Sequence, residues 1–239
     1  MKKIKWNVAF VVLTFCACVG VICYAAIKID TAVTVDNIVT PEMPVIVLDA
    51  GHGGIDGGCS TADGKTEKVI NLNILLSVRD MSRLFGYEVD ATREKDTSIH
   101  DKGVTGIRNQ KISDMENRLE IFNKYTNAVC VSIHQNTFSD PVYNGAQMFY
   151  SDKNPASEEL ASIMQRKFVD NLQPDNQRET KLCGNELYLC YYCNNPSVMI
   201  ECGFLSNPDD AAKLTDKSYQ QKVAFTVFSG ITEFTSSAV

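Results

Sequence analysis

The sequence predicts a single α/β domain with a mostly parallel central sheet flanked by helices, preceded by one N-terminal transmembrane helix. Two observations support the domain. The first is that short apolar runs rich in β-formers alternate along the chain with segments whose apolar residues recur at helical spacing. The length of 239 residues suits one sizeable α/β domain and little more. The helix before it is expected from the composition of the first residues.

Residues 1–27 form a basic start followed by a long apolar run, in which only Asn7 and Thr14 are clearly polar. The run from residue 6 to 27 is long enough to cross a bilayer as a helix and exceeds the core of an ordinary cleaved signal peptide. We expect a signal anchor with its lysines in the cytoplasm and the rest of the chain in the cell envelope. A cleavable signal ending near residue 26 is the alternative. Residues 28–44 are interpreted as a linker, and residues 45–235 as the domain.

The domain is expected to open with a strand over Val45–Leu48, followed by Asp49 and by glycines on both sides of His52. These glycines let the backbone turn sharply and leave the imidazole at the carboxyl end of the strand, where open α/β sheets bind ligands. After a Gly-rich loop, apolar residues at i+3 and i+4 spacing predict a helix from Glu67 that ends at Gly86.

A second strand is expected over residues 87–92, followed by a long polar loop over residues 93–114. Loops of this length inside a compact domain usually have a function. Ser113 resembles the start of a capping box, which predicts that the next helix begins there. The buried strand predicted over residues 128–133 then ends at His134, as the first strand ends near His52.

Residues 145–150 indicate a further strand, at an edge of the sheet, and Ser157 is the expected cap of the helix after it. The aromatic and cysteine-rich residues 186–193 favour no conformation. Residues 197–200 form the last predicted strand, directly before Glu201. Two helices are expected to close the domain, a short one capped by Asn207 and Pro208 and a long one over residues 223–234.

The formal net charge of −6 argues against nucleic acid as a partner and against attraction of anionic polymers by bulk charge. An anionic substrate would have to be held by local groups.

The six cysteines of the domain permit disulfides in an exported protein. Cys130 and Cys202 lie in apolar strands, which favours buried free thiols. A structural zinc site around Cys190 and Cys193, flanked by Cys183 and Cys202, is the alternative. We expect most of the cysteines to be free thiols. The six are Cys59, Cys130, Cys183, Cys190, Cys193 and Cys202.

Titratable residues follow three of the predicted strands. His52 and His134 can converge if their strands are parallel neighbours, and with Glu67 they form a His-His-Glu set that binds zinc. Each has a structural alternative: a hydrogen-bonded histidine, or a carboxylate that complements a helix dipole. Glu201 must either pair with an arginine or belong to a catalytic site, because a buried unpaired carboxylate is costly.

Four segments of the chain form a set in this order and spacing: DAGHGG at 49–54, EK with NL within 67–72, SIHQN at 132–136 and IECGFLSNP at 200–208. Together they resemble the zinc-dependent N-acetylmuramoyl-L-alanine amidases of bacterial cell walls. The resemblance covers residues 45–234, and its departures, at Gln135 and Cys202, remove no ligand. It implies zinc ligands at His52, Glu67 and His134 and a catalytic glutamate at Glu201.

The resemblance implies hydrolysis of the amide between N-acetylmuramic acid and L-alanine in peptidoglycan, with Glu201 moving the proton. Asp49 and Asn136 are candidates for supporting a ligand or binding substrate. Three alternatives remain open: a zinc peptidase acting on peptide stems, a non-catalytic glycan-binding activator, and a thiol enzyme using Cys193 or Cys202.

Within the family, the single anchored domain and the DKG-containing loop at 101–103 resemble the CwlD-type amidases of spore formers. That resemblance implies a role in sporulation and germination, in which peptide stems are removed so that muramic-δ-lactam forms in the spore cortex. It also implies a location in the intermembrane space of the forespore and an activating lipoprotein partner similar to GerS.

Overall fold

The computed structural model describes residues 16–21, 24 and 43–237. Most of the expected signal anchor and linker therefore lies outside the described residues. Residues 16–21 are helical, and no helix within the described ranges is both long and apolar enough to cross a membrane. The residues from Met43 onward form one compact unit, which is described by itself below.

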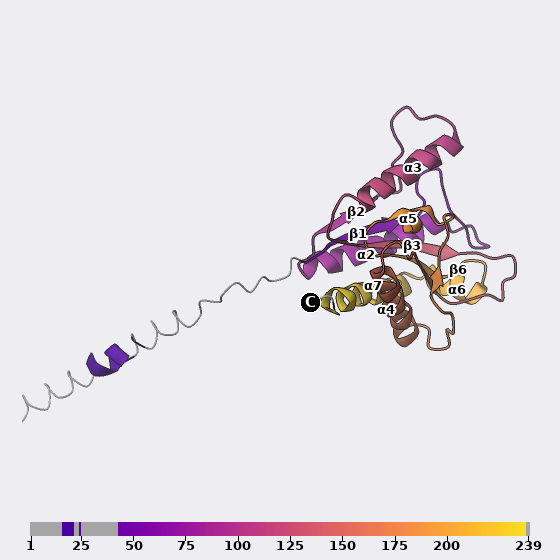
Figure 1. Ribbon diagram of the computed structural model, residues 1–239. Coiled ribbons are helices and arrows are strands. Elements are labelled where there is room, and N and C mark those ends of the chain that lie inside the picture. Colours follow the sequence, from indigo (N-terminus) through magenta and orange to yellow (C-terminus); the bar gives the residue numbers. More distant parts are fainter. Residues whose placement is uncertain (1–15, 22–23, 25–42, 238–239) are drawn as a thin grey trace, which may run out of the picture. The chain divides into compact units, whose positions relative to one another are not determined.

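The domain is built on a six-stranded sheet with the order β2-β1-β3-β6-β4-β5 (Figure 1). β1, β2, β3 and β6 are parallel, β4 is antiparallel to β6, and β5 is parallel to β4. The predicted mostly parallel sheet is thus confirmed, although β4 lies inside it and the short β5 forms the edge. The strands are β1 (Val45–Ala50), β2 (Val89–Ala91), β3 (Ala128–Asn136), β4 (Gln147–Tyr150), β5 (Lys181–Leu182) and β6 (Ser197–Phe204).

Helices cover both faces of the sheet (Figure 1). On one face α7 packs against both α2 and α4, and on the other α3 and α5 pack together. The helices are α2 (Glu67–Leu84), α3 (Ile107–Phe122), α4 (Ala156–Asn171), α5 (Tyr188–Tyr192), α6 (Pro208–Leu214) and α7 (Lys217–Ser237).

The alternation of side chains along the strands divides the core into two layers. In β1, Ile46 and Leu48 belong to the larger cluster, which contains the apolar faces of α2, α4 and α7. Val47 points the other way, into a smaller cluster with Phe122 of α3 and Leu189 of α5. Strands buried on both faces are apolar on both sides, which explains the unbroken apolar run Val45–Leu48 at the start of β1.

Two predicted helix starts are wrong. α3 begins at Ile107, directly after Gly106, whose φ of 84° favours glycine, so the predicted cap Ser113 lies inside the helix. Its hydroxyl instead hydrogen-bonds the carboxylate of Asp101. α4 begins at Ala156, and the hydroxyl of Ser157 accepts the backbone N–H of Ser197. In both cases a serine that resembles a cap uses its hydroxyl in a tertiary contact.

The predicted start of α6 is confirmed. The side chain of Asn207 accepts the N–H groups of Asp209 and Asp210, and a proline follows Asn207 as the first residue of the helix.

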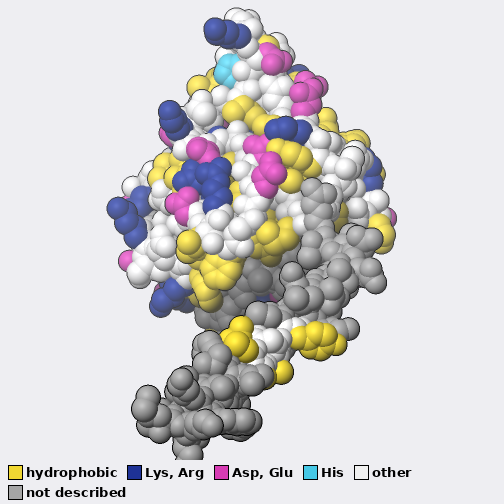
Figure 2. Space-filling view, turned by 90° about the vertical axis from the view of Figure 1, so that its left-hand side faces the viewer, with side chains coloured by type: hydrophobic (Ala, Val, Ile, Leu, Met, Phe, Trp, Pro, Cys, Tyr) yellow, Lys and Arg dark blue, Asp and Glu magenta, His cyan; other side chains and the backbone are white. Residues whose placement is uncertain are grey.

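The surface carries mixed charge: on the face shown in Figure 2, basic and acidic side chains are interspersed with hydrophobic ones. This face therefore has no broad single-sign patch that would attract a polyanion.

Candidate metal centre

His52 lies just beyond the carboxyl end of β1, in a turn with glycines on both sides. Its φ of 64° is the single positive value among the non-glycine residues that the structure describes. Such conformations are costly and are found mostly where a site requires them. At the preceding Gly51, a Cβ atom would lie 2.1 Å from the ring of His134, so a glycine is needed for the two strand ends to approach.

Glu67 is the first residue of α2, and its carboxylate is fixed by the backbone around it. Oε2 accepts the N–H of Cys59 at 2.9 Å, and Oε1 accepts the N–H of Gln135 at 3.0 Å. The amide of Asn71, one turn further along the helix, also donates to Oε1, at 3.2 Å. The side chain is only 3% exposed, so its orientation is set by these donors rather than by solvent.

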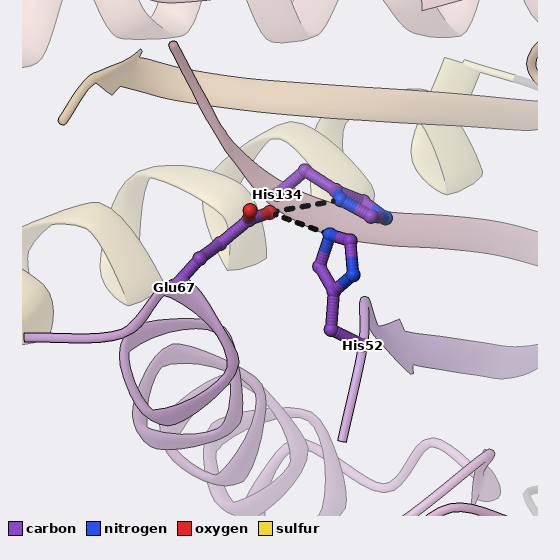
Figure 3. Close-up of side chains that lie close together, drawn as sticks. All are labelled: His52, Glu67 and His134. Atoms are coloured by element: carbon purple, nitrogen blue, oxygen red, sulfur yellow. Dashed lines mark hydrogen bonds and ion pairs between the residues drawn. The ribbon is translucent and has the colours of Figure 1, made fainter. Parts of the chain in front are cut away.

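The structure brings the two histidines and Glu67 together (Figure 3). Oε1 of Glu67 lies 3.2 Å from Nε2 of His52 and 3.0 Å from Nδ1 of His134. One potential ligand atom from each residue lies within 4.8 Å of the other two. Burial acts to raise the pKa of Glu67, but hydrogen bonds from His134 and His52 hold it well below its usual range.

Asp56 orients His52 from the side away from Glu67. Nδ1 of His52 lies 3.1 Å from Oδ2 of Asp56, whose Oδ1 accepts Lys111 at 2.9 Å. Burial lowers the pKa of His52, yet the hydrogen bonds to Glu67 and Asp56 outweigh it and raise the pKa to about 9. This imidazole is therefore turned so that Nε2 faces the other two residues, as a metal ligand with an outer carboxylate partner would be.

Asp49, a candidate for supporting a ligand, is linked to His52 through an intervening arginine. It is 1% exposed and accepts Arg118 at 2.5 Å, Ser132 at 2.6 Å and Thr92 at 2.6 Å. The link to the site runs through Arg118, whose Nη2 donates to the backbone oxygen of His52 at 2.7 Å. Asp49 therefore fixes the guanidinium of Arg118, which in turn fixes the backbone turn at His52.

Glu201 lies on β6 in register with His134 on β3. Its Oε2 is shielded from solvent and has no hydrogen-bond partner among the described residues. Burial raises the pKa of Glu201 to about 7; His134 lowers it and Glu67 raises it. The predicted alternative of an arginine pair is not found in the described part of the chain, and the carboxyl is poised to exchange a proton near neutral pH.

An open pocket gives access to these groups. His52, Glu67, His134 and Glu201 line it, together with Asn136. Oδ1 of Asn136 accepts the N–H of Thr137, which leaves the amide nitrogen free to face a bound molecule.

A second cavity of about 270 Å³ adjoins the pocket at His52 and His134. Its walls include apolar side chains of α3 and of the α5 region, such as Met115, Leu187 and Leu189. The site thus combines a polar centre with an apolar recess, a common arrangement of ligand sites.

The donor set fits zinc. Two imidazoles and one carboxylate leave a fourth position open, which is the composition of catalytic zinc sites. Among the described residues, this is the only group of three or more His, Cys, Asp or Glu side chains close enough to hold a metal ion. The cysteines around Cys190 and Cys193 form no such group, so the alternative zinc site is not found there.

Comparison with known proteins agrees with this geometry. Residues 46–233 match the Amidase_3 family, described as N-acetylmuramoyl-L-alanine amidase. The chain belongs to the N-acetylmuramoyl-L-alanine amidase family. It is therefore an enzyme of peptidoglycan amide hydrolysis, and the resemblance drawn from the four sequence segments is confirmed.

Relatives within the amidase family include a protein of Bacillus subtilis and one of Clostridioides difficile. The germination-specific N-acetylmuramoyl-L-alanine amidase of Bacillus subtilis is 35% identical over 191 residues, covering 80% of this chain and 79% of that protein. The CwlD amidase of Clostridioides difficile, solved in complex with the GerS lipoprotein, is 39% identical. It aligns with a TM-score of 0.78 over 81% of this chain and 99% of the solved chain. The amidase AmiA of Escherichia coli is a more distant relative, at 25% identity over 80% of this chain and 75% of its own length.

Three residues of this amidase site were not predicted from the sequence. Asp56 stands four residues after His52, but in a loop this spacing implies no contact. Asn71 is one turn after Glu67 on α2, a spacing that does predict contact and could have identified it. Arg118 meets Asp49 across 69 positions of sequence, so only the fold brings the two together.

Proposed function

We propose that this amidase is zinc-dependent, with His52, Glu67 and His134 as the protein ligands and Glu201 as the group that moves protons. The observation that supports this most strongly is the pairing of a converged His-Glu-His set with a shielded carboxyl oxygen that has no partner. A structural site would leave no reason for such a carboxyl, because an unpaired buried polar group lowers stability.

A zinc ion on three protein ligands supplies Lewis-acid polarisation of the amide carbonyl and makes water acidic enough to attack near pH 7. Glu201 accepts the proton of the attacking water and delivers it to the nitrogen of L-alanine as the amide bond breaks. Burial raises the pKa of Glu201, which favours uptake of a proton by this carboxyl. Asp56 holds the ring of His52, and Arg118 holds the turn that carries it.

The substrate proposed is a glycan strand of peptidoglycan with its peptide stems. The lactyl amide would enter the open pocket beside Glu201, and the apolar recess formed with α5 would take aliphatic parts of the substrate. Asn136 is proposed to donate its free amide N–H to the substrate. Because the chain carries a formal net charge of −6, binding would depend on these local groups rather than on bulk attraction.

We also propose the finer role indicated by the relatives. The relatives include a germination-specific amidase and a CwlD amidase that forms a complex with a lipoprotein. These similarities support removal of peptide stems for cortex muramic-δ-lactam formation, a GerS-like lipoprotein partner, and a membrane-anchored position in the forespore envelope. The apolar segment before residue 28 is the proposed anchor, residues 28–44 the linker and residues 45–235 the catalytic domain.

The test is digestion of purified peptidoglycan by the full chain with added zinc. New amino termini on L-alanine, together with free lactyl carboxyls on muramic acid, would support the proposal. They should disappear with a chelator and return with zinc. Cleavage within the stems instead, between two amino acids, would favour the zinc peptidase. Binding to glycan without any new amino terminus would favour the non-catalytic activator.

A further inference from the structure

One polar atom outside the metal centre resembles the unpaired oxygen of Glu201. Among the described residues, five buried side-chain nitrogen or oxygen atoms have no hydrogen-bond partner. Two of the five belong to ionisable side chains: Oε2 of Glu201 and Nε of Arg178. Because a buried unpaired polar group lowers stability, a charged one requires a reason to be kept. Glu201 has its reason in the metal centre, and the arginine requires a separate one.

Arg178 differs from the other arginines that are shielded from solvent. Arg79 and Arg118 bind carboxylates, and Arg93 donates to four backbone oxygens. Arg178 has no ion pair within the described ranges, and its side chain makes one hydrogen bond there, from Nη2 to Oε1 of Gln147 at 2.6 Å. Because a guanidinium has five N–H groups, most of its donors are unused.

The partner of this arginine lies beside Glu201 in the sheet. Gln147 on β4 is in register with Glu201 on β6. Their neighbours Met148 and Ile200 belong to the larger core cluster, so the two polar side chains point to the opposite face. The Cβ atoms of residues paired in this way are about 5 Å apart. Arg178, which binds Gln147, therefore extends a row of polar groups that includes Glu201.

Several contacts hold Arg178 in place. The amide of Gln147 has both ends engaged: Oε1 accepts the guanidinium, and Nε2 donates to the backbone oxygen of Glu179 at 2.9 Å. The backbone N–H of Arg178 donates to Oδ1 of Asn176 at 2.9 Å, and the amide of Asn176 donates to the oxygen of Ala146 at 2.8 Å. The segment that carries the arginine is thus fixed to the start of β4. A group positioned in this way loses little freedom when a ligand binds.

Aromatic rings lie beside the guanidinium. Cζ of Arg178 is 5.0 Å from the centroid of the Phe204 ring, a favourable cation–π contact. Tyr143 lies against Phe204 and Phe138 lies against Tyr143, with ring centroids 6.4 Å and 4.9 Å apart. Phe138 and Tyr143 are 54% and 45% exposed, so the row of rings runs from the buried Phe204 to the surface. These rings support the arginine but supply no negative charge.

The chemistry of the unused donors favours a carboxylate as the ligand. Guanidinium N–H groups form a fork that matches the two oxygens of a carboxylate, and such charge-assisted hydrogen bonds are strong. With a formal net charge of −6 the chain attracts no anion by bulk charge, so an anionic group needs a local cation. Lys111, which lines the metal pocket, already pairs with Asp56. In the described part of the chain, Arg178 is thus a cation near Glu201 with donors left for an anion.

We infer that Arg178 binds a carboxylate of the peptide stem and thereby orients the substrate across Glu201. The inference rests on the proposed function, because the stem begins at the amide that this function would break. In that amide the lactyl carboxyl of muramic acid has lost its charge, whereas the stem keeps free carboxylates. A cation in the row of Glu201 therefore contacts the stem rather than the glycan.

The test measures binding of a synthetic stem peptide, L-alanyl-γ-D-glutamyl-L-lysine, to the full chain by calorimetric titration with zinc present. The peptide is prepared in two forms, with its carboxylates free or converted to carboxamides. The native chain should bind the free form about 10-fold or more tightly, because hydrogen bonds between charged groups are stronger than those to a neutral one. The peptide has no bond to muramic acid, so its binding does not depend on hydrolysis.

Variants assign this preference to the arginine. Arg178→Met should bind the two forms about equally, near the affinity of the native chain for the carboxamide form. Arg178→Lys keeps the charge but not the planar fork, so it should retain only part of the preference. This second variant decides the assignment if Arg178→Met fails to fold. Arg166→Met is the matched control, because it removes an exposed arginine from α4, on the other face of the sheet, and should keep the full preference.

Two results would overturn the inference. Equal affinities of the native chain for the two peptide forms would show that no group recognises a stem carboxylate. A preference that persists in Arg178→Met would place the carboxylate elsewhere, such as on the metal ion. Digestion of peptidoglycan tests the proposed function separately. A chain that shows the arginine-dependent preference but releases no L-alanine amino terminus would support the inference and contradict the proposed function.

Discussion

Two carboxylates on parallel strands of the same sheet have opposite environments. Asp49, at the end of β1, accepts hydrogen bonds from Arg118, Ser132 and Thr92. Although burial acts to raise its pKa, Arg118 in particular holds it below the usual range. Glu201 on β6 has an oxygen that is equally shielded but unpartnered, and burial raises its pKa to about 7.

The difference shows how to separate a structural carboxylate from a reactive one when both are shielded from water. Asp49 has its charge fully compensated, so it stabilises the fold and gives up its proton readily. Glu201 has been left without compensation beside two imidazoles and a second carboxylate. The uncompensated group is the one whose protonation can change during a reaction.

The largest expected effect on stability comes from removing the arginine that balances the buried charge of Asp49. Arg118→Met leaves two aspartates, Asp49 and Asp114, without their buried cation. Because unpaired buried charges are strongly unfavourable, the free energy of unfolding should fall by about 3–5 kcal/mol in urea titrations. Arg83→Met is the matched control, since its ion pair with Glu94 is exposed and should contribute less than about 1 kcal/mol. A loss no greater than the control's would mean that Asp49 is not compensated by Arg118.

The pH dependence of stability should differ between the native chain and Asp49→Asn. The pKa of Asp49 is lowered in the folded state, so its contribution is present above the unfolded pKa near 3.9. That contribution is lost as the pH falls through the lower folded pKa. The difference in unfolding free energy between the two proteins, measured from pH 7 downward, should therefore shrink in acid. A difference that is constant with pH would contradict the assignment.

For Glu201→Gln in the presence of a chelator, we expect the opposite pH dependence of the difference in unfolding free energy from the native chain. Since the folded pKa of Glu201 is raised to about 7, its native form is favoured in acid and loses stability as the pH rises from about 4.5 to 7. The glutamine variant escapes this loss, so it should be more stable than the native chain at pH 8 by on the order of 2–3 kcal/mol. Near pH 4 the two should be similar. A variant that is less stable at pH 8 would show that Glu201 has a compensating partner.

The smallest effect concerns the outer contact of His52. Asp56→Asn removes the charge that orients the imidazole and should weaken zinc binding about 10–100-fold, measured by competition with a chelator. Asp63→Asn is a suitable control, because this aspartate pairs with Lys65 and Thr61 at the surface. Equal zinc affinities in the two variants would mean that Asp56 has no role in orienting His52.

The sheet and the three site-bearing strand ends could be predicted because they rest on local pattern. Apolar runs ending in His52, His134 and Glu201 are visible in the sequence, and parallel strands place their carboxyl ends at one edge. Apart from the contact of Asn71 with Glu67, the contacts around them were not predictable, because only the fold brings the partners together. Arg118 reaches Asp49 only once α3 lies across β1, and the serine that resembled the start of α3 is used to bind Asp101 instead.

The conformation of the cysteine-rich stretch could not be predicted from the sequence either. Residues 186–193 favoured no conformation because aromatic residues and cysteines suit helix and strand about equally. Neighbouring strands hold the short α5 in place. The thiol of Cys190 donates to the backbone oxygen of Phe149 on β4, and Leu189 belongs to the same core cluster as Val47 of β1. A segment fixed by tertiary contacts rather than by its own propensity cannot be assigned from its sequence.

The central claim is that Glu201 is the proton-transfer group of a zinc amidase and is not needed to hold the metal. The most direct test measures zinc content and release of L-alanine amino termini from peptidoglycan on one preparation of Glu201→Gln. We predict zinc content equal to the native chain and hydrolysis slower by about 10²–10⁴-fold. Hydrolysis at the native rate with zinc bound would contradict the account.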